Sequence, residues 1–189
     1  MLRLSVALCA LLLCLACSEP PQKEIDRAQG AVDAARAAGA ERYAANEFTA
    51  ATTALQQAHD AVGQSDYRTA LSRAITAYER AQEAAKQAAD GKARARSEAE
   101  GAVNAASTAL HQLRTTIKSP DVQKRTQQLA SARKLAGRVE ASLQEARAHL
   151  AAERYLDASA TLKDIVPQVN AQISELNESG TKPKPVRRR

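Results

Sequence analysis

The 189 residues are enough for one domain or two small ones with a core of their own. About a quarter are alanine, and there is no Trp, one Phe and four Tyr, which favours closely packed helices over a core of large apolar side chains. The net charge of +6 does not indicate nucleic-acid binding, because removing Arg3 and the five cations of the last eight residues leaves 21 basic against 21 acidic residues.

The first segment of the chain is typical of an export signal. A short basic start, Met-Leu-Arg at residues 1–3, precedes an apolar run from Leu4 to Leu15. This run is too short to span a bilayer comfortably, and polar and proline residues follow from Ser18 onward. We therefore predict a cleaved signal peptide over residues 1–16 rather than a transmembrane helix.

All three cysteines, Cys9, Cys14 and Cys17, lie in this segment, so no later cysteine is present to form a disulfide framework. Residues 14–17, Cys-Leu-Ala-Cys, resemble the lipobox of bacterial lipoproteins, in which a small residue precedes the cysteine that receives a diacylglycerol thioether. The resemblance implies signal cleavage after Ala16 and lipidation of Cys17. The sequence departs from the pattern at Cys14, where a lipobox usually has Leu.

A lipidated Cys17 would carry two or three acyl chains such as palmitate, enough for stable membrane anchoring. Ser18 stands where an Asp favours inner-membrane retention in enterobacterial lipoproteins, so the same resemblance implies the outer membrane, facing the periplasm. Residues 17–22 are then the lipidated N-terminus and a short tether. The alternative is ordinary cleavage after Ala16, which leaves a soluble periplasmic protein with a free thiol.

Residues 23–118 form an alanine-rich region of predicted helical hairpins, because apolar residues recur there every three or four positions. The first helix is expected to end at Gly39, a residue that suits the end of a helix. The second is expected to have Asn46 as its N-cap and to end at Gly63.

A third helix is predicted to follow Ser65 and Asp66, both of which are favourable capping residues. Its apolar spacing continues as far as Ile117. Gly91 and Gly101 are expected to loosen this continuation, because glycine disfavours the helix interior.

Residues 119–178 are predicted to form a second helical hairpin. Ser-Pro-Asp at 119–121 is typical of a helix start, with Ser at the N-cap and Pro in the first turn. A heptad seam then runs from Val122 to Leu150, and a break is expected near residues 153–154. The last helix should extend from Tyr155 to Leu176, with a kink at Pro167.

Residues 179–189 are predicted to be a disordered basic tail, because they combine Gly and Pro with cations. An extended chain of this charge would attract anionic lipid, lipopolysaccharide or an acidic partner. The alternative is a solubilising end with no partner. The cations concerned are Lys182, Lys184, Arg187, Arg188 and Arg189.

The alternating pattern of a strand is absent from the sequence, so the predicted fold is all-α: antiparallel helical hairpins or an elongated helical bundle with coiled-coil-like alanine-rich seams. One set of residues recurs 88 positions later without a gap, which suggests an internal duplication. The alternative is that any alanine-rich heptad sequence aligns with itself. The recurring residues are Leu55, Gln56, Ala58, Tyr67 and Ala70, repeated as Leu143, Gln144, Ala146, Tyr155 and Ala158.

Alanines every three or four residues over 28–89, with Ala-Glu-Arg-Tyr at 40–43 and Ser-Asp-Tyr-Arg-Thr-Ala-Leu at 65–71, resemble an alanine-rich domain of unknown function. This domain occurs in many small proteobacterial lipoproteins, sometimes ahead of an OmpA-like domain. The Tyr-x-x-Ala after a turn is also similar to the second helix of a tetratricopeptide repeat, although the Trp and Leu-Gly of that repeat are missing. The resemblance implies an envelope location and helical hairpins, but no activity.

Residues suited to catalysis or metal binding do not converge in the sequence. His59, His111 and His149 are isolated from one another and from metal-ligand spacing, and each is interpreted as a surface residue. Glu98 and Glu100 fall on different faces of a helix, so they do not predict an acid–base pair. A binding role for Tyr67 and Tyr155 is less favoured than packing in the hairpins. We therefore expect no enzyme, no cofactor and no metal.

These features favour a non-enzymatic cell-envelope lipoprotein that acts as a helical scaffold or protein-interaction module, through a protein partner or self-association. The alternative is a periplasmic ligand-binding or chaperone-like protein, which would need a large apolar pocket. A third class, helices that unfold onto a lipid surface, needs broad Leu, Phe and Trp faces that this sequence lacks.

Overall fold

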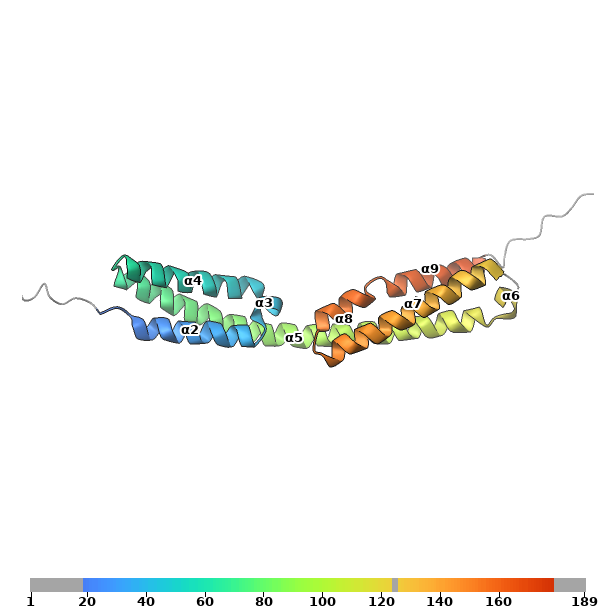
Figure 1. Cartoon of the computed structure of the whole chain (residues 1–189), viewed down its shortest axis with the longest axis horizontal. Coiled ribbons are helices and arrows are strands. Elements are labelled where there is room, and N and C mark those ends of the chain that lie inside the picture. Colours follow the sequence, from blue (N-terminus) through green and yellow to red (C-terminus); the bar gives the residue numbers. More distant parts are fainter. Residues whose placement is uncertain (1–18, 124–125, 179–189) are drawn as a thin grey trace, which may run out of the picture. The chain divides into compact units, whose positions relative to one another are not determined.

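The computed structural model describes residues 19–123 and 126–178, and within them the chain is helical and contains no strand (Figure 1). This confirms the all-α prediction. None of the described helices is long and apolar enough to cross a membrane. The helices are α2 (Gln22–Ala37), α3 (Ala40–Tyr43), α4 (Ala45–Gly63), α5 (Tyr67–Ile117), α6 (Pro120–Gln123), α7 (Thr126–Ala151), α8 (Tyr155–Leu162) and α9 (Ile165–Glu178).

The chain divides into two compact units, Met1–Gly91 (unit 1) and Lys92–Arg189 (unit 2). The division falls inside α5, whereas the hairpin regions expected from the sequence met at 118–119. Each unit therefore uses one part of α5 as a helix of its own core. The apolar periodicity is continuous along α5, so it does not show where one unit ends and the next begins.

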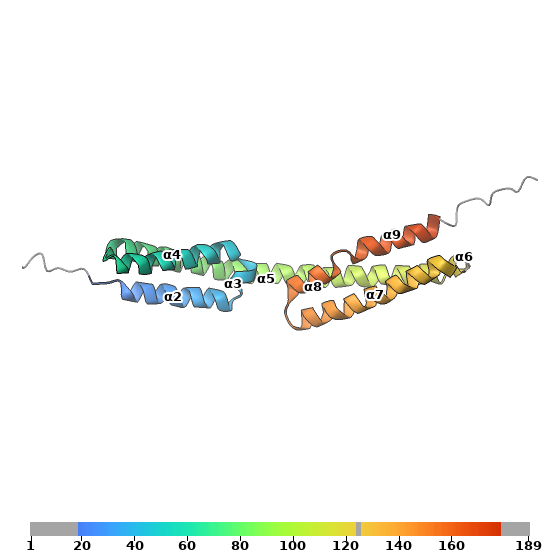
Figure 2. The ribbon, with the colours of Figure 1, turned by 45° about the horizontal axis from the view of Figure 1, so that its top comes forward.

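Unit 1 packs α2, α4 and the first part of α5 side by side, as both views show (Figures 1 and 2). The α5 side of its core consists of alanines, which let the other helices approach closely. The largest buried side chains come from α2 and α4 and fill the space that these alanines leave. Those side chains are Ile25, Val32, Phe48 and Leu55, and the alanines are Ala74, Ala77, Ala81, Ala84 and Ala88.

The link between α2 and α4 confirms one expected helix end and corrects one expected start. Gly39 has φ of +85°, a left-handed conformation that favours glycine, and its N–H bonds to the Arg36 carbonyl. The prediction of Asn46 as an N-cap was wrong, because α4 begins at Ala45 and Ala44 holds the cap position. Ala44 is the single residue between α3 and α4, and its carbonyl accepts the first helical bond from the Phe48 N–H.

The turn from α4 to α5 follows the expected pattern. The Ser65 N–H bonds to the Val62 carbonyl and the Asp66 N–H to the Ala61 carbonyl, the two bonds of a Schellman motif. Ser65 adopts φ of +57°. The Asp66 side chain then accepts a bond of 3.0 Å from the Thr69 N–H, so Asp66 caps the start of α5 as predicted.

The expected loosening of α5 at Gly91 and Gly101 was wrong, because α5 is one helix of 51 residues. A single glycine costs only about 1 kcal/mol relative to alanine, and the alanine-rich sequence around each favours the helix. Gly91 also has a packing role, because a Cβ built there would lie 2.9 Å from the Tyr43 carbonyl oxygen. At Gly101 a Cβ would meet nothing within 4 Å.

Unit 2 packs the second part of α5 with α7 and the α8–α9 segment, which lies along α7 (Figure 1). The predicted kink at Pro167 was wrong in form, because the helix is interrupted at residues 163–164 and Pro167 lies in the first turn of α9. There its missing N–H costs nothing, whereas a continuous helix would drive its ring against the carbonyl of residue 163. Pro167 is exposed, as its outward position predicts.

The turn between α7 and α8 repeats the α4–α5 turn at the 88-residue offset. The Glu153 N–H bonds to the Leu150 carbonyl, the Arg154 N–H bonds to the His149 carbonyl, and Glu153 has φ of +56°. Nine buried positions of the flanking helices also correspond, although others do not. They are Phe48, Ala51, Leu55, Ala58, Ala70, Ala74, Ala77, Ala81 and Ala88 in unit 1, and Ala136, Val139, Leu143, Ala146, Ala158, Leu162, Ile165, Val169 and Leu176 in unit 2. This agreement supports the duplication hypothesis over a chance alignment of alanines.

Candidate functional site: a groove between α5 and α7

Several residues singled out in the sequence lie outside the described residues. These are the signal cleavage site at Ala16, the lipidation site at Cys17 and the tail cations Lys182, Lys184, Arg187, Arg188 and Arg189. Their predicted roles stay predictions.

The three histidines are dispersed over the helices. His59 is exposed on α4, and His111 lies on the second part of α5. His149 is half-buried and its Nδ1 accepts a hydrogen bond of 2.9 Å from Arg154 Nε, which orients the ring at the end of α7. Within 19–123 and 126–178, no three His, Cys, Asp or Glu side chains are grouped as a metal site would require.

The tyrosines and glutamates considered earlier have local structural roles. Tyr155 is buried and Tyr67 half-buried, as hairpin packing predicts. Glu100 forms an ion pair of 2.8 Å with Arg96, and Glu98 is exposed elsewhere on α5. A hydrogen bond to Glu100 and the negative charge of that carboxylate raise the pKa of the Arg96 guanidinium, so the pair holds Arg96 in its charged form.

A groove runs along the surface of unit 2 between α5 and α7, and we call it the basic groove. Two adjoining hollows of about 320 and 390 Å³ form it and share Arg114 and Glu140. Its floor contains buried apolar side chains, and its rims are polar or charged. The floor residues are Leu110, Ile117, Ala136 and Leu143, and the rim residues are Ser107, His111, Arg114 and Lys118 from α5 with Arg133, Gly137, Glu140, Gln144 and Arg147 from α7.

Helical spacing explains why these rim residues line one groove. On each helix they follow one another at intervals of three and four residues, which places them along a single edge. From Ser107 to Lys118 this edge is about 16 Å long at 1.5 Å per residue. Gly137 lies on the α7 edge, and a Cβ there would meet nothing within 4 Å, so the groove is open above it.

Positive charge predominates along the basic groove. Arg114 pairs with Glu140 across it, and Arg147 Nη2 donates to Ser107 Oγ at 3.4 Å. Lys118 and Arg133 are exposed and form no ion pair with any described residue. Four cations therefore face one carboxylate, a balance that would attract an anionic group.

The sequence indicated some of the cations of the basic groove but not how they come together. Residues 92–138 are locally basic in the sequence, but the overall balance of 21 basic against 21 acidic residues does not reveal this excess. Arg147 lies outside that stretch, and the packing of α7 brings it beside Ser107. The three-and-four spacing of the rim residues was the available signal, but only the pairing of α5 with α7 gives it meaning.

A second groove lies in unit 1 between α2 and α5, and three of its polar side chains bond to one another. The Arg27 guanidinium lies 4.2 Å from the centre of the Tyr78 ring and donates to the Tyr78 hydroxyl at 3.0 Å. Gln82 donates to the same hydroxyl at 2.7 Å. Beside them Ile75 and Leu71 are partly exposed, a small patch of the kind common on protein surfaces.

A salt bridge holds the α7–α8 turn to α5 near one end of unit 2. Lys92 Nζ lies 2.6 Å from Glu153 Oε2. The hydrogen bond and positive charge from Lys92 lower the pKa of the Glu153 carboxyl. Because Glu153 occupies the left-handed position of the turn, this bridge fixes the turn that starts α8.

Comparison with known proteins identifies one domain. A family model described as "Domain of unknown function (DUF4398)" matches residues 23–100, which include α2, α3, α4 and α5 as far as Glu100. This confirms the expected domain of unknown function over these residues. No match is found among curated proteins or solved structures.

Proposed function

We propose that this chain is a non-enzymatic, lipid-anchored scaffold of the cell envelope that binds a protein partner through the surface of its helices. In this proposal Cys17 is the lipid attachment site, and the helical units face the periplasm from the outer membrane. The observation that carries the scaffold role is the composition of the core: in the described chain every buried residue is aliphatic or aromatic, and none is charged. Such a molecule offers surfaces to a partner rather than an interior site.

The anchor rests on the lipobox-like residues 14–17 and on the apolar run before them. A Cys17→Ser variant removes the thiol that would be lipidated, and Cys14→Leu is its matched control. Cys14→Leu also removes one thiol, but it brings the segment closer to the usual lipobox.

The measurement is intact mass spectrometry of the chain from membrane and soluble fractions of a Gram-negative host. Wild type and Cys14→Leu should give a membrane-bound species that begins at Cys17 and carries diacylglycerol. Cys17→Ser should lack that species. An unmodified soluble wild-type chain with a free thiol would overturn the lipid anchor and favour a diffusible periplasmic protein.

The alternative function is a periplasmic ligand-binding or chaperone-like protein. It requires an apolar pocket, and the described grooves of unit 2 have charged rims and lie along the surface. An environment-sensitive apolar dye separates the two functions, because a chaperone-like protein should bind it in the folded state. A scaffold should bind it only on unfolding.

A further inference from the structure

We propose that the basic groove of unit 2 is the docking site for an acidic helix of a partner protein. This inference rests on the proposed function, because it names the class of partner that the scaffold would bind. It assigns the recognition to four cations, Arg114, Lys118, Arg133 and Arg147, and to the open floor beside Gly137.

The shape of the groove favours a helix. Two neighbouring helices of unit 2 form its walls, and a third rod of similar radius can lie between them in the manner of helix-in-groove recognition. The small residues Gly137, Ala136 and Ser107 let the backbone of such a helix approach closely. The length of about 16 Å corresponds to three turns of helix, which present about three side chains to each rim.

The charges of the groove favour an acidic occupant. Arg114 already contacts Glu140, so the groove holds one carboxylate of its own chain against a guanidinium. Lys118 and Arg133 lie at the same end of the groove without an ion pair among the described residues. An acidic helix would supply the carboxylates that these two cations lack.

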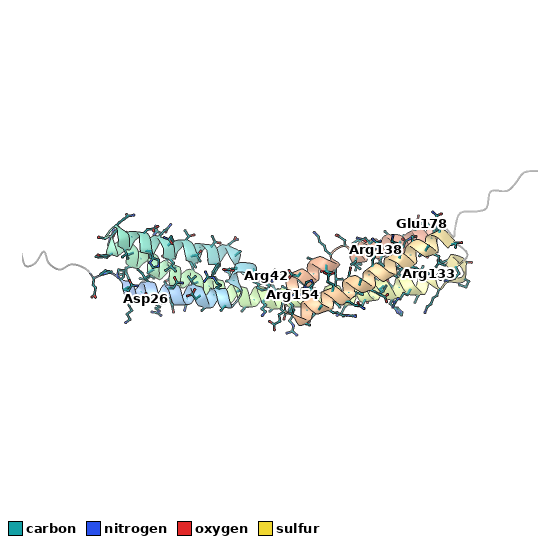
Figure 3. The ribbon with its side chains drawn as sticks, in the orientation of Figure 1. Asp26, Arg42, Arg133, Arg138, Arg154 and Glu178 are labelled. Carbon is teal, nitrogen blue, oxygen red and sulfur yellow. The ribbon has the colours of Figure 1, made fainter. Side chains whose placement is uncertain are left out.

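The concave shape of the groove favours a helix over a membrane surface as its ligand. A planar anionic lipid surface contacts the convex parts of a bundle rather than a groove. The exposed cations Lys134 and Arg138 lie on α7 but do not line the groove. Figure 3 labels Arg138 together with the groove residue Arg133. A helix contacts the cations inside the groove instead. This difference makes Lys134 and Arg138 natural controls, because they share the helix, the charge and the exposure of Arg133.

The test measures binding of the full-length chain, purified in a non-ionic detergent, to a fluorescein-labelled peptide by fluorescence polarisation. The peptide is a synthetic helix of about 16 residues, long enough to exceed the groove, with Glu along one face and Ala and Leu along the other. A peptide with Lys in place of Glu controls for charge. Phosphatidylglycerol vesicles are the probe for lipid binding.

Two pairs of variants make the test specific. Lys118→Glu with Arg133→Glu reverses two groove cations, and Lys134→Glu with Arg138→Glu makes the same change in charge outside the groove. Gly137→Leu fills the groove without changing charge, and Gly101→Leu is its matched control on an open helix surface. Circular dichroism confirms that each variant is folded.

We expect the Lys118/Arg133 variant and Gly137→Leu each to weaken binding of the acidic peptide about tenfold, with both controls within about twofold of wild type. The Lys peptide should not bind. Equal loss in groove and control variants would overturn the proposal, as would absence of binding to the acidic peptide. Vesicle binding that needs the groove cations, without peptide binding, would overturn it in favour of lipid. These outcomes leave the lipid anchor at Cys17 to its own test.

Discussion

Gly91 provides the sharpest test of how the helices of unit 1 are packed. Replacing it by Ala adds a methyl group that favours a helix interior by about 1 kcal/mol. The added Cβ would also lie 2.9 Å from the Tyr43 carbonyl oxygen and 3.1 Å from the Tyr43 Cβ. Backbone must move to relieve the first contact, and forced overpacking costs about 1–3 kcal/mol. The two effects together predict a loss of up to about 2 kcal/mol for Gly91→Ala.

Two other glycines supply matched controls, because a Cβ at either meets nothing within 4 Å. Gly30→Ala makes the same change in α2 of the same unit, and Gly101→Ala makes it in the same helix. Both should gain about 1 kcal/mol. Urea unfolding followed by circular dichroism at equal protein concentration measures all three variants. If Gly91→Ala gains as much stability as Gly30→Ala, the close contact with Tyr43 does not constrain the fold, and the argument is refuted.

Three further predictions concern the turns and the core. Ser65→Gly should raise the unfolding free energy by about 1 kcal/mol, because Ser65 holds a left-handed φ of +57° that glycine adopts without strain; an unchanged urea midpoint would contradict this. Lys92 lowers the folded-state pKa of Glu153, so wild type should have a higher free energy of unfolding than Glu153→Gln at neutral pH. This difference should vanish as the pH falls through the lowered pKa. A difference in urea midpoint that does not change with pH would exclude the linkage. Ala77→Ile places in unit 1 the residue that unit 2 has at position 165. It should lower the free energy of unfolding by urea by about 1–3 kcal/mol, because Ala77 is fully buried in a close-packed seam. An unchanged free energy would show that the seam can expand.

Local sequence signals predicted the fold and most helix ends because these depend on neighbouring residues. Gly39 and Asp66 mark a helix end and a helix start through their own backbone and side-chain preferences. Asn46 failed because α4 begins one residue before it, at Ala45, so Asn46 lies inside the first turn and Ala44 holds the cap position without a side-chain bond. Gly91 and Pro167 failed for a related reason. Their effects depend on what packs against the helix and where the helix begins, and the sequence pattern states neither.

The basic groove could not be predicted because it depends on which helices are neighbours. Arg114 and Glu140 lie 26 positions apart, and Ser107 and Arg147 lie 40 apart, so no local motif joins them. The sequence did contain the spacing that aligns each rim along its own helix. Only the packing of α7 against α5 brings these two rims together. The cations of both rims then lie in one place, although the charge of the whole chain body is balanced.

The two units have similar turns and corresponding buried positions, but they differ in what fills those positions. Unit 1 has Ala74, Ala77 and Ala81 where unit 2 has Leu162, Ile165 and Val169. The α8–α9 segment thus brings larger side chains into the core of unit 2 than the first part of α5 brings into unit 1, and in a close-packed interior each such difference must fit the side chains around it. The turns are alike in the two units, whereas the core side chains differ. The surface is free of that constraint, so a groove for a partner can arise in one unit without a counterpart in the other.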